Sequence, residues 1–194
     1  MKSTSLTGLL LSIVVFTLGC VASGRLREAP AHIKVLNIDK QQLARSSSLL
    51  SNERPSVWII AHPDCPIVQK YTKNLNEFQA AYPQVDFYSI MTRWTDEAEV
   101  RIFRDSFQFQ LPIYQDTRHK LIHRLHATTT PEVFLWDKNG QLVYRGAIDN
   151  WFFSLGRYRP AATERYLEDA LKAVLAEQKA PVTATQPIGC LIGK

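Results

Sequence analysis

The chain has 194 residues, of which 45% are hydrophobic and 21% charged, values typical of one globular domain with tails. The formal net charge is +5, but Lys and Arg are scattered and never form a run of five. This distribution excludes a long basic tract of the kind that binds nucleic acid, so we expect no nucleic-acid partner.

The N-terminus has the pattern of an export signal. Residues 6–19 are mostly apolar but too few to span a bilayer comfortably, since that takes about 20 residues. Residues 17–20 resemble a bacterial lipobox, in which Cys20 would become the lipidated first residue. Ordinary cleavage after Ala22 and an uncleaved anchor are the alternatives. We expect residues 1–20 to be the signal, and the protein to be exported, either periplasmic or held at a membrane only through this N-terminal lipid.

Residues 21–31 are small and polar and predict a tether, and the Ser-rich residues 41–55 predict a loop with a helical turn. Strands are predicted where short apolar or alternating runs occur: 33–38, 56–61, 85–91, 111–114, 132–137 and 141–145. Helices are predicted where apolar residues recur every three and four positions: 66–82, 96–107, 117–126 and 163–178. Thr95 and Asp116 are the expected caps of the second and third helices.

The order of these elements predicts an α/β domain over residues 32–179. Strand–helix–strand units give parallel neighbours, and Asn139-Gly140 between the last two strands indicates an antiparallel hairpin. We therefore expect a central mixed sheet, with a parallel core and a C-terminal antiparallel hairpin, flanked by helices. Residues 180–194 have no helical or strand period and predict a flexible tail that carries Cys190.

Cys65 is the strongest candidate for a reactive residue. It falls between the apolar run 56–61 and the helix that Pro66 begins. The first N–H groups of a helix have no intrahelical partner, and with the helix dipole they stabilise a thiolate, which is the nucleophilic form of Cys. A protonated His62 would add to this effect, whereas Asp64 would oppose it.

Three segments together resemble the thioredoxin-like superfamily, in its redoxin branch (the alkyl-hydroperoxide-reductase and thiol-specific-antioxidant group). They are WIIAHPDCPIVQKY, TTPEVFLWDKNGQLVYRGAIDN and GCLI, and the resemblance covers roughly residues 32–192. Exported bacterial redoxin-domain proteins share the DCPI motif. The resemblance implies a thioredoxin-like fold with Cys65 as the attacking cysteine. It also implies a cis peptide bond before Pro131, with Thr130 offering backbone hydrogen bonds to a bound partner chain.

The chain departs from the thioredoxin pattern at Val68, where thioredoxins carry a second Cys. The peroxidatic signature of true peroxiredoxins is missing as well. Cys190 is the natural replacement, because a tail that folds back could bring it to a mixed disulfide or sulfenic acid on Cys65. A tail Cys that pairs between chains or does nothing is the alternative.

The sequence thus predicts a thiol-dependent oxidoreductase that acts on a disulfide-containing protein or a peroxide and is regenerated by an external thiol, with no cofactor. Two other functions stay open. His62, Cys65 and Cys190 together would suit copper, as soft sulfur and imidazole ligands do. The third hypothesis is a non-catalytic binding domain. In it, a Cys65–Cys190 disulfide only attaches the tail to the domain.

Overall fold

The computed structural model describes residues 28–30, 32–50, 53–92 and 96–193. The predicted signal, Cys20 and most of the tether lie outside these residues. Among the described residues, no helix is both long and apolar enough to cross a membrane.

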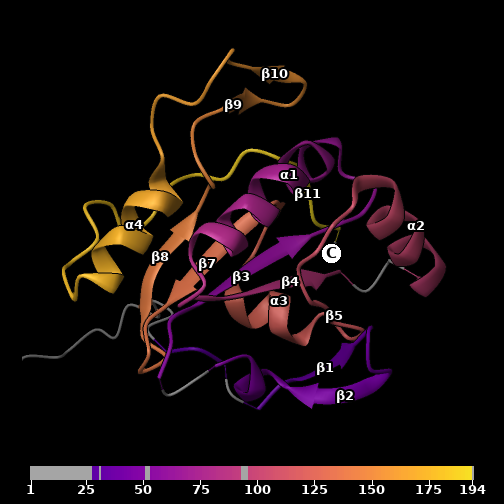
Figure 1. The fold of residues 1–194 in the computed structure, drawn as a ribbon. Helices are drawn as coiled ribbons and strands as arrows, with labels where there is room; N and C mark the ends of the chain where they lie inside the picture. Colours follow the sequence, from indigo (N-terminus) through magenta and orange to yellow (C-terminus); the bar gives the residue numbers. More distant parts are fainter. Residues whose placement is uncertain (1–27, 31, 51–52, 93–95, 194) are drawn as a thin grey trace, which may run out of the picture.

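A seven-stranded mixed sheet forms the centre of the molecule, in the order β2-β1-β5-β4-β3-β7-β8 (Figure 1). The strands β3, β4 and β5 run parallel, and the remaining neighbours pair antiparallel. The predicted mixed sheet, with its parallel core and C-terminal hairpin, is confirmed. Its strands are β1 (Lys34–Asn37), β2 (Gln42–Arg45), β3 (Ser56–Ala61), β4 (Asp86–Met91), β5 (Ile113–Gln115), β7 (Glu132–Trp136) and β8 (Leu142–Gly146).

Helices cover both faces of this sheet. They are α1 (Pro66–Ala81), α2 (Glu97–Phe107), α3 (Lys120–Leu125) and α4 (Tyr166–Leu175), with a 3-10 turn, η1, at Ser46–Leu49. Side chains of α1, α2 and α4 pack with Val57 and Ile59 of β3 into one core, whereas α3 and η1 pack with Trp58 and Ile60 into another. Because successive strand residues point to opposite faces, the unbroken apolar run of β3 is buried on both sides, as predicted.

Two predicted details are wrong. Within residues 41–55 the structure has a strand, β2, before the helical turn. The side chains of β2 are mostly exposed, so the strand depends on pairing with β1 rather than on an apolar pattern. Asp116 does not cap its helix from the adjacent position. The N-cap of α3 is His119, and the Asp116 carboxylate instead accepts from the N–H of Ile122 at 2.9 Å.

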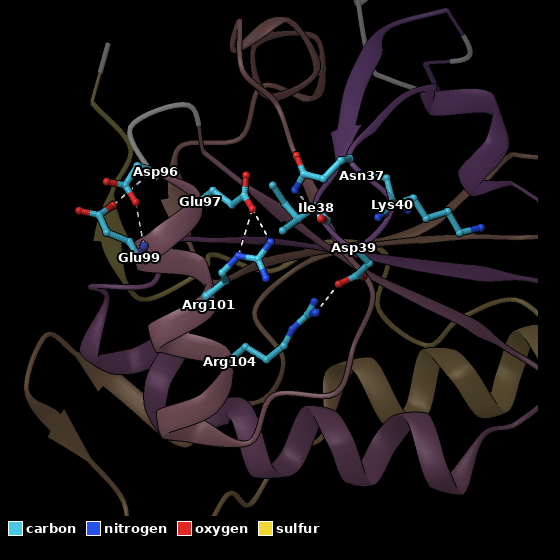
Figure 2. A network of polar contacts seen from close by, with 10 residues as sticks. Asn37, Ile38, Asp39, Lys40, Asp96, Glu97, Glu99, Arg101 and Arg104 are labelled. Atoms are coloured by element: carbon cyan, nitrogen blue, oxygen red, sulfur yellow. Dashed lines mark hydrogen bonds and ion pairs between the residues drawn. The ribbon is translucent and has the colours of Figure 1, made fainter.

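The helix α2 is held by polar contacts at its start and along one side (Figure 2). Thr95 lies outside the described residues, and Asp96 is the N-cap, forming a reciprocal capping box with Glu99. Arg104, in the last turn, forms an ion pair with Asp39 in the β1–β2 connection. The ion pair with Asp39 therefore connects the last turn of α2 to the β1–β2 connection.

The chain after β8 contains two short pairings that the sequence did not predict. Phe152–Ser154 (β9) and Arg157–Tyr158 (β10) form a small hairpin. In the tail, Cys190–Leu191 (β11) pairs antiparallel with Thr129–Thr130 (β6), although no strand was expected there. The tail therefore crosses from α4 to the region beside the start of α1 (yellow in Figure 1).

Candidate functional site

Cys65 lies where the sequence places it, between β3 and α1. It is the N-cap residue of α1, is only 2% exposed, and is followed by Pro66 in the first turn. Its backbone N–H donates to the carbonyl of His62 at 3.1 Å, which closes the turn out of β3. A central strand thus leads this thiol to the start of α1, the longest helix among the described residues.

The Cys65 side chain makes a different contact from the one expected. It forms no cap hydrogen bond with the first turn of α1, where Pro66 has no N–H to offer. Its Sγ instead donates to the carbonyl oxygen of Thr130 at 3.1 Å. The Thr130–Pro131 peptide bond is cis, as the resemblance implies. The thiol is therefore held against the backbone of the segment that precedes β7.

Cys190 is brought to the same place by the tail. It lies opposite Thr130 in the β11–β6 pair, and the N–H of Ile192 donates to the Thr128 carbonyl at 2.9 Å. Cys190 and Cys65 line the same cavity, and both are free thiols. Two cysteines 125 positions apart in sequence thus line one cavity, as the hypothesis of a returning tail requires.

The pKa of Cys190 depends on its neighbour Cys65. Burial, then the hydrogen bond to Cys65, then the charge of Cys65 raise the pKa of Cys190 to about 12. At neutral pH Cys190 is therefore a protonated thiol. Two of these three causes depend on Cys65, so a covalent bond at Cys65 would remove both of them and make Cys190 more acidic.

Gly189 allows the tail to approach this closely. A Cβ built there would lie 1.9 Å from the carbonyl oxygen of Thr130, far inside any permitted contact. This is the same oxygen that accepts from Cys65. Any residue larger than glycine would force the tail away from Thr130, because the opposing atom belongs to the backbone and cannot rotate aside.

A cavity of about 210 Å³ surrounds the two thiols. The hydroxyls of Thr92 and Thr130 are buried there without a hydrogen-bond partner among the described residues. Buried polar groups are normally paired, so these hydroxyls could bond a small polar molecule in the cavity. The lining residues are His62, Asp64, Cys65, Thr92, Thr130, Cys190, Leu191, Ile192 and Gly193.

The copper hypothesis has its residues in one cavity but not as a preformed site. His62 lines the cavity with both cysteines, and its Nδ1 accepts from the N–H of Asp64 at 3.2 Å. Within the part of the chain that the structure describes, no group of three or more His, Cys, Asp or Glu side chains is arranged to hold a metal ion.

Sequence reasoning proposed Cys65, Cys190, Thr130, Pro131 and His62 as site residues but did not propose Thr92 or Gly189. Thr92 follows β4, whose carboxyl end lies beside that of β3, and residues at this edge of parallel strands gather at binding sites. Gly189 stands directly before Cys190, and a glycine beside a reactive residue is a signal for close backbone approach. Both could have been proposed from position alone.

No protein-family model matches the chain, and no curated protein matches it either. Solved structures do. A hypothetical protein from Sinorhizobium meliloti is 20% identical, with a TM-score of 0.70, over 87% of this chain and 94% of that chain. A secreted disulfide oxidoreductase from Mycobacterium tuberculosis, described as homologous to Escherichia coli DsbE, is 18% identical, with a TM-score of 0.53, over 75% of this chain and 96% of that chain.

A peroxiredoxin-like protein from Aquifex aeolicus is 19% identical, with a TM-score of 0.52, over 77% of this chain and 86% of that chain. At such identities the likeness concerns the fold. The mixed sheet, the helices on both faces and the cis Thr130–Pro131 bond agree with it. The chain therefore has a thioredoxin-like fold.

Proposed function

We propose that this protein is a thiol-dependent oxidoreductase in which Cys65 attacks the substrate and Cys190 resolves the intermediate. The observation that carries the proposal is that the two free thiols line one cavity beside Thr130, with Cys65 at the N-cap of α1. Solved structures that share the fold and are described as a disulfide oxidoreductase and as peroxiredoxin-like are consistent with this chemistry.

With a disulfide as substrate, the Cys65 thiolate attacks one sulfur of the substrate. A mixed disulfide forms, and the second substrate sulfur leaves as a thiolate and takes up a proton. Cys190 then loses its proton and attacks the Cys65 sulfur, so that the Cys65–Cys190 bridge forms and the first substrate sulfur leaves as a thiol. The substrate gains two electrons and two protons, the protein loses them, and an external dithiol restores the reduced pair.

A hydroperoxide would oxidise the same pair. Cys65 takes the terminal oxygen and becomes a sulfenic acid, while the remainder leaves as an alcohol or water. Condensation of the sulfenic acid with the Cys190 thiol forms the same bridge and releases water. Both substrates converge on one oxidised state, so the bridge is the species to measure.

The raised pKa of Cys190 sets the order of the two cysteines. Because its pKa is raised, Cys190 keeps its proton at neutral pH and does not compete with Cys65 for the first attack. Once Cys65 is bonded to substrate, its charge and its hydrogen bond to Cys190 disappear. The Cys190 thiol then ionises more readily, at the stage when it has to attack.

We further propose that the protein works outside the cytoplasm, held at a membrane through a lipid on Cys20. The signal-like N-terminus supports this, as does the M. tuberculosis neighbour that is described as secreted. Such a compartment permits a Cys65–Cys190 bridge to persist between turnovers.

The test is non-reducing mass mapping of the full chain in a series of redox buffers. We expect a reversible Cys65–Cys190 bridge with a potential above about −300 mV, as labile catalytic bridges have. Cys65→Ser should abolish reduction of disulfides and peroxides. Cys190→Ser should still form a mixed disulfide or sulfenic acid at Cys65 but should not release it. Two thiols that never pair in any buffer would contradict the proposal.

A further inference from the structure

The tail occupies the backbone edge beside Cys65. Residues 189–192, named here the C-terminal strap, run antiparallel to β6, with Cys190 opposite Thr130 and Leu191 opposite Thr129. The N–H of Ile192 donates to the Thr128 carbonyl. An extended polypeptide that binds by adding a strand to a free edge would use these same backbone groups of β6.

The strap also walls in the thiol. Residues 190–192 of the strap, together with Gly193, line the cavity that contains Cys65, and Cys65 is only 2% exposed. A cavity of about 210 Å³ admits a small molecule but not a folded chain segment with its side chains. A polypeptide can therefore reach Cys65 only when the strap has left β6.

The strap has the features of a reversible cover rather than of core structure. Its pairing with β6 spans two residues, and Leu191 is 84% exposed. Cys190 and Ile192 pack against the two cores but are only partly buried, so a limited apolar surface holds the strap in place. Gly189 is required for the strap to pair with β6, since a Cβ at this position would collide with the Thr130 carbonyl. Segments with few buried contacts open locally at a small fraction of the cost of global unfolding.

We propose that the C-terminal strap occupies the backbone edge of β6 to which a polypeptide substrate would bind. While the strap is paired with β6, only small oxidants reach Cys65. The strap must leave β6 before a protein disulfide can reach Cys65. This inference rests on the proposed function, because it assigns a substrate class to each state of the same site. In the seated state a small oxidant enters the cavity and forms the Cys65–Cys190 bridge. In the released state the edge of β6 is free to pair with an extended substrate segment.

The experiment compares two reagents that share one reactive group but differ in size, N-ethylmaleimide and a maleimide carrying a long polyethylene glycol chain. Loss of the unmodified Cys65 peptide is followed in the reduced full chain by mass spectrometry. The measured quantity is the ratio of the Cys65 modification rate with the bulky reagent to the rate with the small reagent. In Gly189→Ala we expect this ratio to rise about tenfold. A tenfold larger released population corresponds to a change of about 1.4 kcal/mol in the equilibrium between the paired and the released strap. Val182→Ala, an exposed change elsewhere in the tail, should leave the ratio unchanged.

Ile192→Pro is the second variant, because it removes the N–H that donates to Thr128 without adding bulk at Thr130. Hydrogen exchange at the β6 amides reports whether the strap has left. If exchange rises in either variant while the ratio of rates stays at the wild-type value, the strap does not restrict access and the inference is overturned. If neither variant raises exchange, the seating requirement at Gly189 is wrong and the inference also falls.

The outcome is separable from that of the proposed function. If the ratio of rates changes in Gly189→Ala but no Cys65–Cys190 bridge forms in any redox buffer, the strap inference is supported and the proposed oxidoreductase function is refuted. If a reversible bridge forms but the ratio of rates is unchanged, the proposed function is supported and the strap inference is refuted. The third measurement is mixed-disulfide formation between Cys65 and an extended disulfide-bonded peptide. It should rise in Gly189→Ala by the same factor as the rate with the bulky maleimide.

Discussion

Replacing Cys65 with Ala should make Cys190 markedly more reactive at alkaline pH. The pKa of Cys190 is raised from 9.0 to about 12, and two of its three causes, the hydrogen bond and the charge, come from Cys65. A thiol with a pKa of about 12 is ionised in about one molecule in a thousand at about pH 9, and each unit by which the pKa falls raises that fraction about tenfold. Burial, the largest cause, remains in the variant, so the pKa should settle between the two values.

The assay is the rate at which iodoacetamide alkylates Cys190 between about pH 7 and pH 11, followed on its own peptide by mass spectrometry. Because the thiolate is the reacting species, the rate should rise at least about tenfold at about pH 9 in Cys65→Ala. Amide hydrogen exchange at Ile192 is the control, since unchanged exchange shows that the strap is still seated. An identical pH profile in wild type and variant would refute the electrostatic coupling of the two thiols.

Three further predictions concern the frame of the site. Gly146→Ala should lower the free energy of unfolding by about 2 kcal/mol or more, measured with urea, because Gly146 has a φ of 134° and its Cβ would lie 2.3 Å from the Thr185 carbonyl oxygen. Arg145→Met should cost about 3 kcal/mol in the same assay, since the buried Glu132 carboxylate loses its ion-pair partner. Stability that stays within about 0.5 kcal/mol of wild type would contradict either one. Burial raises the pKa of Glu132 above its ordinary 4.5, so the folded state holds that proton more tightly than the unfolded state. The stability of wild type relative to Glu132→Gln should therefore fall as pH rises from about 4.5 through the raised value, and a constant difference across this range would contradict the assignment.

The sequence pattern predicts those helices and strands whose own residues form an apolar run or an apolar repeat. β3 is an unbroken apolar run, and α1 repeats apolar residues such as Val68, Tyr71 and Leu75 on one face, so both were predicted nearly to the residue. Burial of these segments is decided by their own composition. The same reasoning led directly to Cys65, because the junction of two such elements is fixed once both are known.

The elements that pattern alone misses depend on a distant partner. β2 has mostly exposed side chains, and β11 is only two residues long, so neither has a period that can be recognised. Each exists because another strand offers it backbone hydrogen bonds, β1 in one case and β6 in the other. The proximity of Cys190 to Cys65 could be proposed from chemistry, but the register that places it opposite Thr130 is a property of the folded chain.

Hydrogen bonds attach residues 183–192 of the tail to the domain at two places, with Ile188 packed against the core between them, and this limits how far Cys190 can travel. The first attachment is beside β8, where Thr185 donates its N–H to the Arg145 carbonyl at 3.0 Å and Arg145 donates to the Thr183 carbonyl at 3.1 Å. The second is the strap. When the strap leaves β6, Cys190 is still connected to Thr185 by five residues. The distance between these two residues can then be at most about 17 Å. A connection this short keeps the effective concentration of the Cys190 thiol near Cys65 in the millimolar range. The resolving thiol would therefore remain available even while a large substrate is paired with β6 in place of the strap.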